Sequence, residues 1–191
     1  MDRLAPASTA LLLIDLQNGI LQIPVAPHTS SEIVGRAAEL ADKFRKAGGT
    51  SICTRVTWSP DFRDALQPAV DRPIQGPTPG PDWADFPDAL GMVPGDLTIT
   101  KRQWGAFYGT ELDLQLRRRG IRTIVLGGIA TNLGVESTAR AAWEHGYEII
   151  FVEDATASLS AEMHRFAFSA IFPLIGRVRS ARQVFDMLAA G

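Results

Sequence analysis

The chain has 191 residues, 46% hydrophobic and 21% charged, a composition typical of one globular domain. Its 19 Lys and Arg nearly balance 21 Asp and Glu, and the resulting net charge of −2 argues against nucleic acid as a partner. The single cysteine, Cys53, excludes a disulfide scaffold and a zinc site built on several thiolates.

The N-terminal segment has neither the length nor the flanking residues of a signal peptide. It carries an acid at Asp2, and its apolar run at 10–14 ends in Asp15. No stretch approaches the roughly 18 uncharged apolar residues of a membrane helix. We therefore expect a cytoplasmic protein with no membrane partner.

Short apolar runs alternate with longer segments of helical periodicity, which predicts β-α-β units and a mostly parallel sheet. Most runs are continuously apolar, as in strands that helices cover on both faces. The predicted strands are 10–16, 50–57, 97–100, 122–126, 148–152 and 174–178.

The helices are predicted from their ends. Thr29 to Glu32 forms a capping box that opens a helix ending at Gly48. Thr110 to Asp113 is a version of the same box with a shorter acid, and Gly120 closes its helix. Further helices are predicted at about 133–145, 161–172 and 181–190.

A proline-rich connection at about 60–95 interrupts this alternation, with eight of the twelve prolines. So long an irregular segment inside a compact domain is usually a binding loop or a linker. Trp83 and Phe86 favour an ordered cover packed over something, and a plain surface excursion is the alternative. With no repeat or second domain apparent, we expect one domain over 1–191.

Polar residues follow three of the apolar runs, at the strand ends where open α/β sheets bind ligands. Asp15 follows the first run, Lys101 follows the run at 97–100, and a glycine-rich turn at 127–134 follows the fourth. Placing a carboxylate directly after an apolar strand costs free energy unless the carboxylate is hydrogen-bonded or has a function. The alternatives are a solvated strand end for Asp15 and a solvated charge for Lys101.

The glycine-rich turn matches neither a dinucleotide fingerprint nor a phosphate loop. It leaves a helix N-terminus, whose free N–H groups can stabilise an anion or a developing oxyanion. Trp104, Phe107 and Tyr108 follow Lys101 and can wall a pocket; alternatively, they cap the core beneath the helix at Thr110.

These segments resemble the isochorismatase-like superfamily, also called cysteine hydrolases. The resemblance rests on Leu-Leu-Ile-Asp-Leu-Gln at 12–17, on Lys101 with Gly-Ala-Phe-Tyr-Gly-Thr at 105–110, and on the block 121–155. It implies a three-layer αβα fold with a six-stranded parallel sheet in the order 3-2-1-4-5-6. It also implies a homo-oligomer, a dimer or tetramer, in which the 60–94 segment could close a neighbour's pocket.

The resemblance also implies a mechanism. Amidase members use an Asp, a Lys and a Cys; Asp15 and Lys101 match the first two, and the nucleophile position falls on Gly134. A thioester route through that position is impossible. Isochorismatases also carry glycine there and protonate a vinyl ether from the Asp. Asp15 is then the general acid/base, and Lys101 holds a substrate carboxylate. The Lys101 ammonium lowers the pKa of Asp15, whereas a general acid needs a raised pKa. The effect of burial would therefore have to exceed that of Lys101.

Other expectations concern the surroundings of these residues. The substrate contacts are expected at Gln17, Trp104, Phe107, Ala130, Thr131 and Asn132. Many family members have a cis peptide where this chain has Ile129–Ala130. Thr57 to Pro60 replaces the nicotinamidase metal motif, so no metal or cofactor is expected. Cys53 is expected to be an inert buried thiol, and His164 to be solvated or in an interface.

Three functions follow from this pattern. The first is a hydrolase for a small carboxylated molecule, acting without a covalent nucleophile. The second is a catalytically silent small-molecule-binding protein that kept the pocket. The third is a lyase or isomerase that uses the same acid/base pair. The segment Ala130 to Asn132 resembles the amidases rather than the isochorismatases, which leaves the substrate open.

Overall fold

A six-stranded parallel sheet forms the centre of the molecule in the computed structural model, which describes residues 3–73 and 79–189. The strand order is β3-β2-β1-β4-β5-β6, as the family resemblance implies. The strands are β1 (Thr9–Ile14), β2 (Thr50–Val56), β3 (Leu97–Lys101), β4 (Thr123–Ile129), β5 (Glu148–Ala157) and β6 (Arg177–Arg179).

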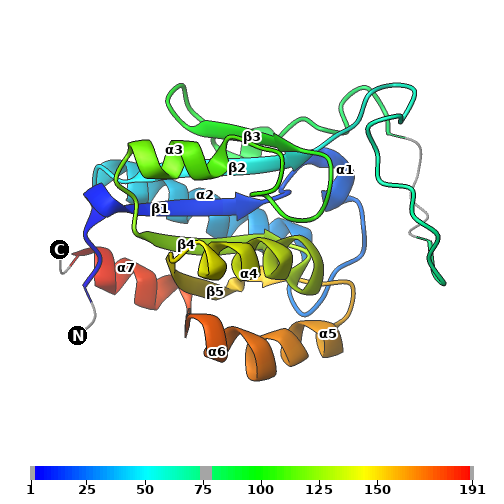
Figure 1. The fold of residues 1–191 in the computed structure, drawn as a ribbon. Coiled ribbons are helices and arrows are strands. Elements are labelled where there is room, and N and C mark those ends of the chain that lie inside the picture. The colour runs from blue at the N-terminus through cyan, green and yellow to red at the C-terminus, as the bar shows by residue number, and fades with distance from the viewer. Residues whose placement is uncertain (1–2, 74–78, 190–191) are drawn as a thin grey trace.

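Helices cover both faces of this sheet (Figure 1). One face carries α2 (Ser30–Lys46) and α7 (Ala181–Ala189). The other carries α3 (Leu112–Arg118), α4 (Glu136–Glu144), α5 (Ala161–Phe166) and α6 (Phe172–Ile175). A short α1 (Asn18–Leu21) follows β1, and π-helical turns occupy Thr131–Val135 and Ala167–Ile171.

Strand β1 shows why its run of apolar residues is continuous. All six of its residues are buried, because successive side chains point to opposite faces of a sheet that is covered on both. Leu11 and Leu13 pack in the core on the α2 and α7 side, whereas Ala10, Leu12 and Ile14 pack in the core on the other side.

Several element ends differ from the predicted ones. The capping box of Thr29 and Glu32 is confirmed, but the predicted box at Thr110 is wrong. Helix α3 begins two residues later, and the Thr110 hydroxyl accepts from Leu112 N–H inside a turn. The predicted strand at 174–178 begins too early, because Leu174 belongs to α6 and extended backbone resumes at Gly176.

The proline-rich connection divides into two parts. Residues 66–73 are all exposed, and the connection extends beyond the body of the molecule (Figure 1). Its second part packs: Trp83 lies against Gly19 of α1, whose N–H donates to the Trp83 carbonyl, and Leu90 is buried. Both predicted alternatives therefore hold, each for one part. Among the described residues, no helix is long and apolar enough to cross a membrane.

Candidate active site

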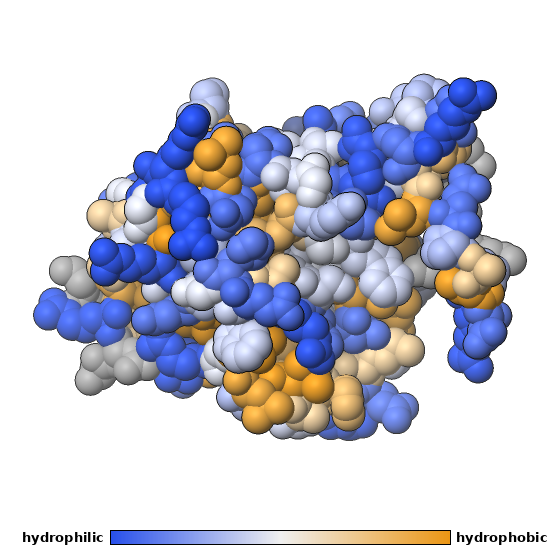
Figure 2. Space-filling view, in the orientation of Figure 1, coloured by the Kyte–Doolittle hydropathy of each residue, from blue (hydrophilic) through white to orange (hydrophobic). Residues whose placement is uncertain are grey.

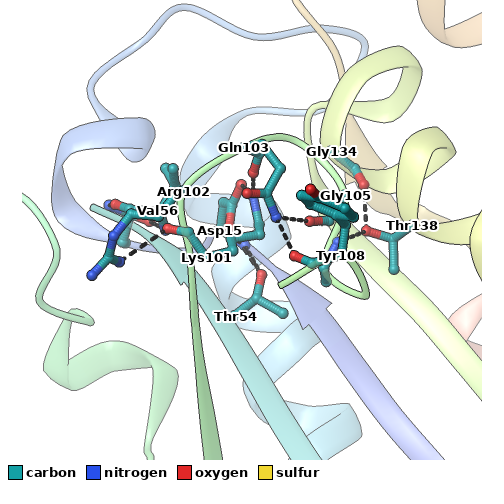
Figure 3. Close-up of polar contacts among 12 residues, drawn as sticks. Asp15, Thr54, Val56, Lys101, Arg102, Gln103, Gly105, Tyr108, Gly134 and Thr138 are labelled. Atoms are coloured by element: carbon teal, nitrogen blue, oxygen red, sulfur yellow. Dashed lines mark hydrogen bonds and ion pairs between the residues drawn. The ribbon is translucent and has the colours of Figure 1, made fainter. Parts of the chain in front are cut away.

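Asp15 lies directly after β1, with a φ of 53° that turns the chain at the strand end. Its Oδ2 accepts from Lys101 Nζ at 2.6 Å, and its Oδ1 accepts from the Thr54 hydroxyl at 2.9 Å (Figure 3). The Asp15 N–H donates to the Thr54 carbonyl at 3.2 Å. Both carboxylate oxygens and the backbone of Asp15 are thus held by neighbouring strands.

The strand register explains how Lys101 reaches Asp15. In parallel pairing, Ile14 lies beside Thr54 of β2, and Val56 of β2 lies beside Lys101 of β3. Lys101 therefore extends across the end of β2, where it is only 1% exposed. Its ammonium also donates to the Gln103 carbonyl at 3.0 Å, which leaves one N–H without a partner among the described residues.

Burial dominates the electrostatics of Asp15. Removal from water raises the pKa of its carboxyl above the ordinary value, and this effect outweighs Lys101 and the Thr54 hydrogen bond, which both lower it. The expected condition, that the effect of burial on this pKa exceeds the effect of Lys101, is thereby met. A carboxyl with a raised pKa can hold a proton nearer to neutral pH than an exposed aspartic acid can.

Gly134 lies in the π-helical turn that follows β4, beside the Asp15–Lys101 pair. A Cβ at this position would lie 3.4 Å from Asp15 Oδ2, 3.5 Å from the Trp104 carbonyl oxygen and 3.0 Å from Ile14 Cγ2. The Gly134 carbonyl accepts from the Thr138 hydroxyl at 2.7 Å, which holds the turn to α4. A side chain at position 134 would therefore point at the carboxylate.

The turn is held in place from outside by α5 and by the end of β5. The Ile129–Ala130 peptide bond is cis, as the family resemblance implies. Thr131 is buried, and its hydroxyl lies 2.9 Å from His164 Nδ1; Asn132 accepts from the Ser158 hydroxyl. These side chains are occupied in supporting the turn.

His164 is buried rather than solvated, so that alternative for this residue is wrong. Its ring lies 4.5 Å from the Phe168 ring, and its Nε2 has no partner among the described residues. Burial, with a smaller contribution from nearby His28, lowers the pKa of His164 to about 4. The imidazole that supports Thr131 is therefore neutral at pH 7.

The structure places three of the predicted substrate contacts in three different environments. The Gln17 amide is fully buried; its Oε1 accepts from Val56 N–H at 2.7 Å, and its Nε2 donates to the Val56 and Trp83 carbonyls. Phe107 is buried in the core and stacks on the exposed His145, 5.1 Å between ring centroids. Trp104 keeps a side chain with 51% exposure and places its carbonyl beside Gly134.

No replacement nucleophile comes from Cys53. The thiol is buried within β2, on the side of the sheet that packs against α2 and α7. Burial raises its pKa to about 12, so the thiolate is scarcely populated at neutral pH. Within residues 3–73 and 79–189, no three His, Cys, Asp or Glu side chains are grouped to hold a metal ion.

Sequence reasoning missed Thr54 and His164 as parts of this arrangement. Thr54 lies inside an apolar strand, where a threonine is an ordinary strand residue, and only its register with β1 brings it to Asp15. His164 lies 33 positions after Thr131 on a separate helix. Neither contact has a signal in the local pattern.

Comparison with known proteins identifies the family. The isochorismatase domain matches residues 9–183. The chain is 51% identical to the isochorismatase family protein YecD of Escherichia coli O157:H7 over 181 residues, covering 95% of this chain and 96% of YecD. It is 32% identical to the ureidoacrylate amidohydrolase RutB of Methylorubrum extorquens over 174 residues, covering 78% and 69%.

A solved structure supports the same relationship. An isochorismatase family protein from Burkholderia thailandensis superposes with a TM-score of 0.95 at 46% identity, over 99% of each chain. The sheet order, the sequence matches and this superposition agree. The chain therefore belongs to the isochorismatase family, and it is a hydrolase of that family.

Proposed function

We propose that the protein hydrolyses a small carboxylated molecule without a covalent nucleophile, with Asp15 as general acid/base. One observation carries the proposal. The buried Asp15 carboxylate lies between Lys101 and Thr54, with Oδ2 3.4 Å from the point that a Cβ at Gly134 would occupy. A substrate or water molecule in contact with Asp15 Oδ2 would be within proton-transfer distance of the carboxyl.

Two hydrolytic routes use this geometry. With a vinyl ether, protonated Asp15 donates its proton to the terminal carbon; water then adds to the oxocarbenium ion and returns a proton to Asp15, and the hemiketal collapses to an alcohol and a carbonyl product. With an amide or urea, the Asp15 carboxylate takes a proton from the attacking water and passes it to the leaving amine. Each route consumes one water and regenerates Asp15.

Lys101 has two functions in this proposal. Its ammonium balances the charge of ionised Asp15, and its remaining N–H can donate to a substrate carboxylate. The turn at Thr131–Val135 presents the N-terminal end of the helix that continues into α4, which favours an oxyanion. Trp104 places its backbone carbonyl beside Gly134 and keeps an exposed side chain.

The related ureidoacrylate amidohydrolase suggests a substrate class. Ureidoacrylate carries a urea group and a carboxylate, a combination that matches an oxyanion-stabilising turn next to a lysine. A carboxylated urea or amide is therefore one candidate substrate, and a carboxylated vinyl ether is the other. Gln17 and Phe107 contribute by holding the site and its surroundings, through the backbone contacts and ring stacking described above.

The second candidate is a silent binding protein. It is favoured by the glycine at position 134 and by the engagement of both Asp15 oxygens with Lys101 and Thr54. Such a protein would keep the pocket and the charge pair but perform no chemistry. An acid/base lyase or isomerase would convert its substrate without consuming water.

The test compares the parent protein with Asp15→Asn on carboxylated vinyl ethers, ureas and amides, each beside an uncharged analogue. We expect turnover of one carboxylated class and a kcat roughly 100- to 10,000-fold lower in Asp15→Asn, a magnitude typical for loss of a general acid/base. Cys53→Ser is the matched control and should keep full activity. Equal ligand affinity with no turnover in either protein would establish the silent binder instead.

A further inference from the structure

The hydroxyl of Thr138, in the first turn of α4, joins two segments of the candidate active site. One is the loop 102–110, called here the Lys101 loop, and the other is the turn Thr131–Val135. The hydroxyl donates to the Gly134 carbonyl at 2.7 Å and accepts from the Ala106 N–H at 3.1 Å (Figure 3). A threonine that bonds the carbonyl four residues earlier is common in helices, but a second bond from a distant segment is not part of that pattern.

The Lys101 loop is closed on itself by the side chain of Gln103. Its Nε2 donates to the Gly105 carbonyl at 2.9 Å and to the Tyr108 carbonyl at 2.7 Å (Figure 3). The Gln103 carbonyl accepts from Lys101 Nζ at 3.0 Å. A loop held in this way moves as a unit, so its attachment at Ala106 also fixes the carbonyl that holds the ammonium.

The turn on the other side of Thr138 is π-helical. The Ala130 carbonyl accepts from the Leu133 N–H at 3.1 Å and from the Val135 N–H at 3.2 Å, three and five positions later. A π-helical turn is wider than a turn of α-helix, and such turns are frequent at functional sites. The position of this turn within the site therefore depends on contacts from outside it, such as the bond from Thr138 to the Gly134 carbonyl.

The Lys101 loop packs directly on α4, away from water. A Cβ at Gly105 would lie 3.7 Å from Ser137 Cβ, which is an ordinary contact distance. Side chains cover α3 and α4 on this side of the molecule (Figure 2), and both Ala106 and Thr138 are 0% exposed. An N–H or carbonyl group left unpaired at such a place costs free energy, so both groups bonded by Thr138 depend on its hydroxyl.

We propose that Thr138 is a positioning residue, whose hydroxyl sets the distance between the turn at Gly134 and the Asp15–Lys101 pair. It acts through the Gly134 carbonyl on one side and through the Lys101 loop on the other. The inference deepens the proposed function and rests on it for its catalytic consequence. A displacement of about 1 Å between groups that act together can cost roughly 100-fold in rate.

The first test needs no substrate, because the thiol introduced by Gly134→Cys reports on the site. Thr138→Val keeps the shape of the side chain and removes the hydroxyl, whereas Thr138→Ser keeps the hydroxyl. We expect Thr138→Val to slow the reaction of this thiol with iodoacetamide roughly threefold or more, which corresponds to about half a pKa unit. The reason is that a thiolate displaced from the Lys101 ammonium and from the turn is less stabilised. Thr138→Ser should restore the rate to within about twofold.

Thr9→Val is the matched control for the loss of a buried hydroxyl. Thr9 is 1% exposed, and its hydroxyl donates to the Ala5 carbonyl, four positions earlier, at 2.8 Å. It lies at the opposite end of β1 from Asp15, so the thiol rate should not change. An unchanged rate in Thr138→Val would overturn the proposal, as would an equal loss in Thr138→Ser or in Thr9→Val.

Gln103→Met tests the same connection from the loop side if Thr138→Val does not fold, which circular dichroism establishes. This change removes the bonds to the Gly105 and Tyr108 carbonyls, so it should slow the thiol introduced at position 134 in the same way. A folded Gln103→Met variant with an unchanged thiol rate would contradict transmission through the Lys101 loop.

The second test uses a substrate that the parent protein hydrolyses. Thr138→Val should lower kcat roughly 10- to 100-fold and leave KM nearly unchanged, because the hydroxyl positions the site without touching substrate, and Thr138→Ser should restore kcat. A parent that hydrolyses nothing would refute the proposed function, and the thiol rates would still decide the position of Thr138. An active parent whose kcat and thiol rate are unaffected by Thr138→Val would refute this inference alone.

Discussion

Replacing Lys101 with methionine should destabilise the protein strongly, because it removes the cation beside a buried carboxylate. Lys101 is almost fully buried, and its Nζ lies 2.6 Å from Asp15 Oδ2. Methionine keeps much of the volume of the side chain but provides no charge. Asp15 would keep only the Thr54 hydroxyl as a side-chain partner.

The magnitude follows from the burial of the pair. Leaving one partner of a buried ion pair without the other costs about 3–5 kcal/mol, a large part of a total stability of roughly 5–15 kcal/mol. Loss of the lysine raises the folded-state pKa of Asp15 further above its unfolded value. Stability is then lost as pH rises from the unfolded pKa toward the folded pKa, by up to about 1.4 kcal/mol per pH unit.

Urea unfolding at pH 5 and pH 7 measures both effects, provided the m-value stays constant. Lys46→Met is the control, because Lys46 forms an exposed ion pair with Asp42 at 2.7 Å and its loss should change the free energy of unfolding little. The double variant Asp15→Asn, Lys101→Met should lose less than the sum of its single changes. If Lys101→Met costs no more than Lys46→Met, the assigned electrostatics of the site are wrong.

Two further predictions concern the thiol and the histidine. The thiol introduced by Gly134→Cys should react with iodoacetamide, while Cys53, with a pKa of about 12, stays unmodified. Mass spectrometry of the labelled peptides measures both reactions. A thiol at position 134 that reacts as slowly as Cys53 would contradict its placement beside Asp15. His164 has a folded-state pKa of about 4, below its unfolded value of about 6.5, so the free energy of unfolding should fall as pH drops through that interval. His164→Phe should remove this pH dependence, and thermal unfolding between pH 4 and 7 measures it; an identical pH profile in both proteins would argue against a buried neutral imidazole.

Much of the candidate site was predictable because of where its residues fall along the chain. Asp15, Lys101 and the turn containing Gly134 each come at the end of an apolar run, and the ends of parallel strands share one edge of the sheet. The family resemblance supplied the strand order, which determines which of these ends are close. The local pattern and the family resemblance together were sufficient to predict that these three strand ends lie close together.

The partners of these residues could not be predicted in the same way. Gln17 was expected to contact substrate, yet its amide bonds the end of β2 and the Trp83 carbonyl. Phe107 lies within a dense aromatic segment that suggests a pocket wall, but it is buried in the core and stacks on the exposed His145. In both cases the outcome depends on a contact with a segment far away in the sequence.

The amino-acid sequence by itself determined the alternation of strands and helices, the burial of strands such as β1 and the glycine-rich turn at Gly134, since these depend on residue type and local order. The family resemblance added that position 134 is where relatives carry the nucleophile. Only the tertiary structure decided that Thr54 holds Asp15, that His164 supports Thr131, and that Thr138 joins the turn to the Lys101 loop. The physical reason is that strand register and helix packing set which side chains meet, and both are properties of the assembled fold.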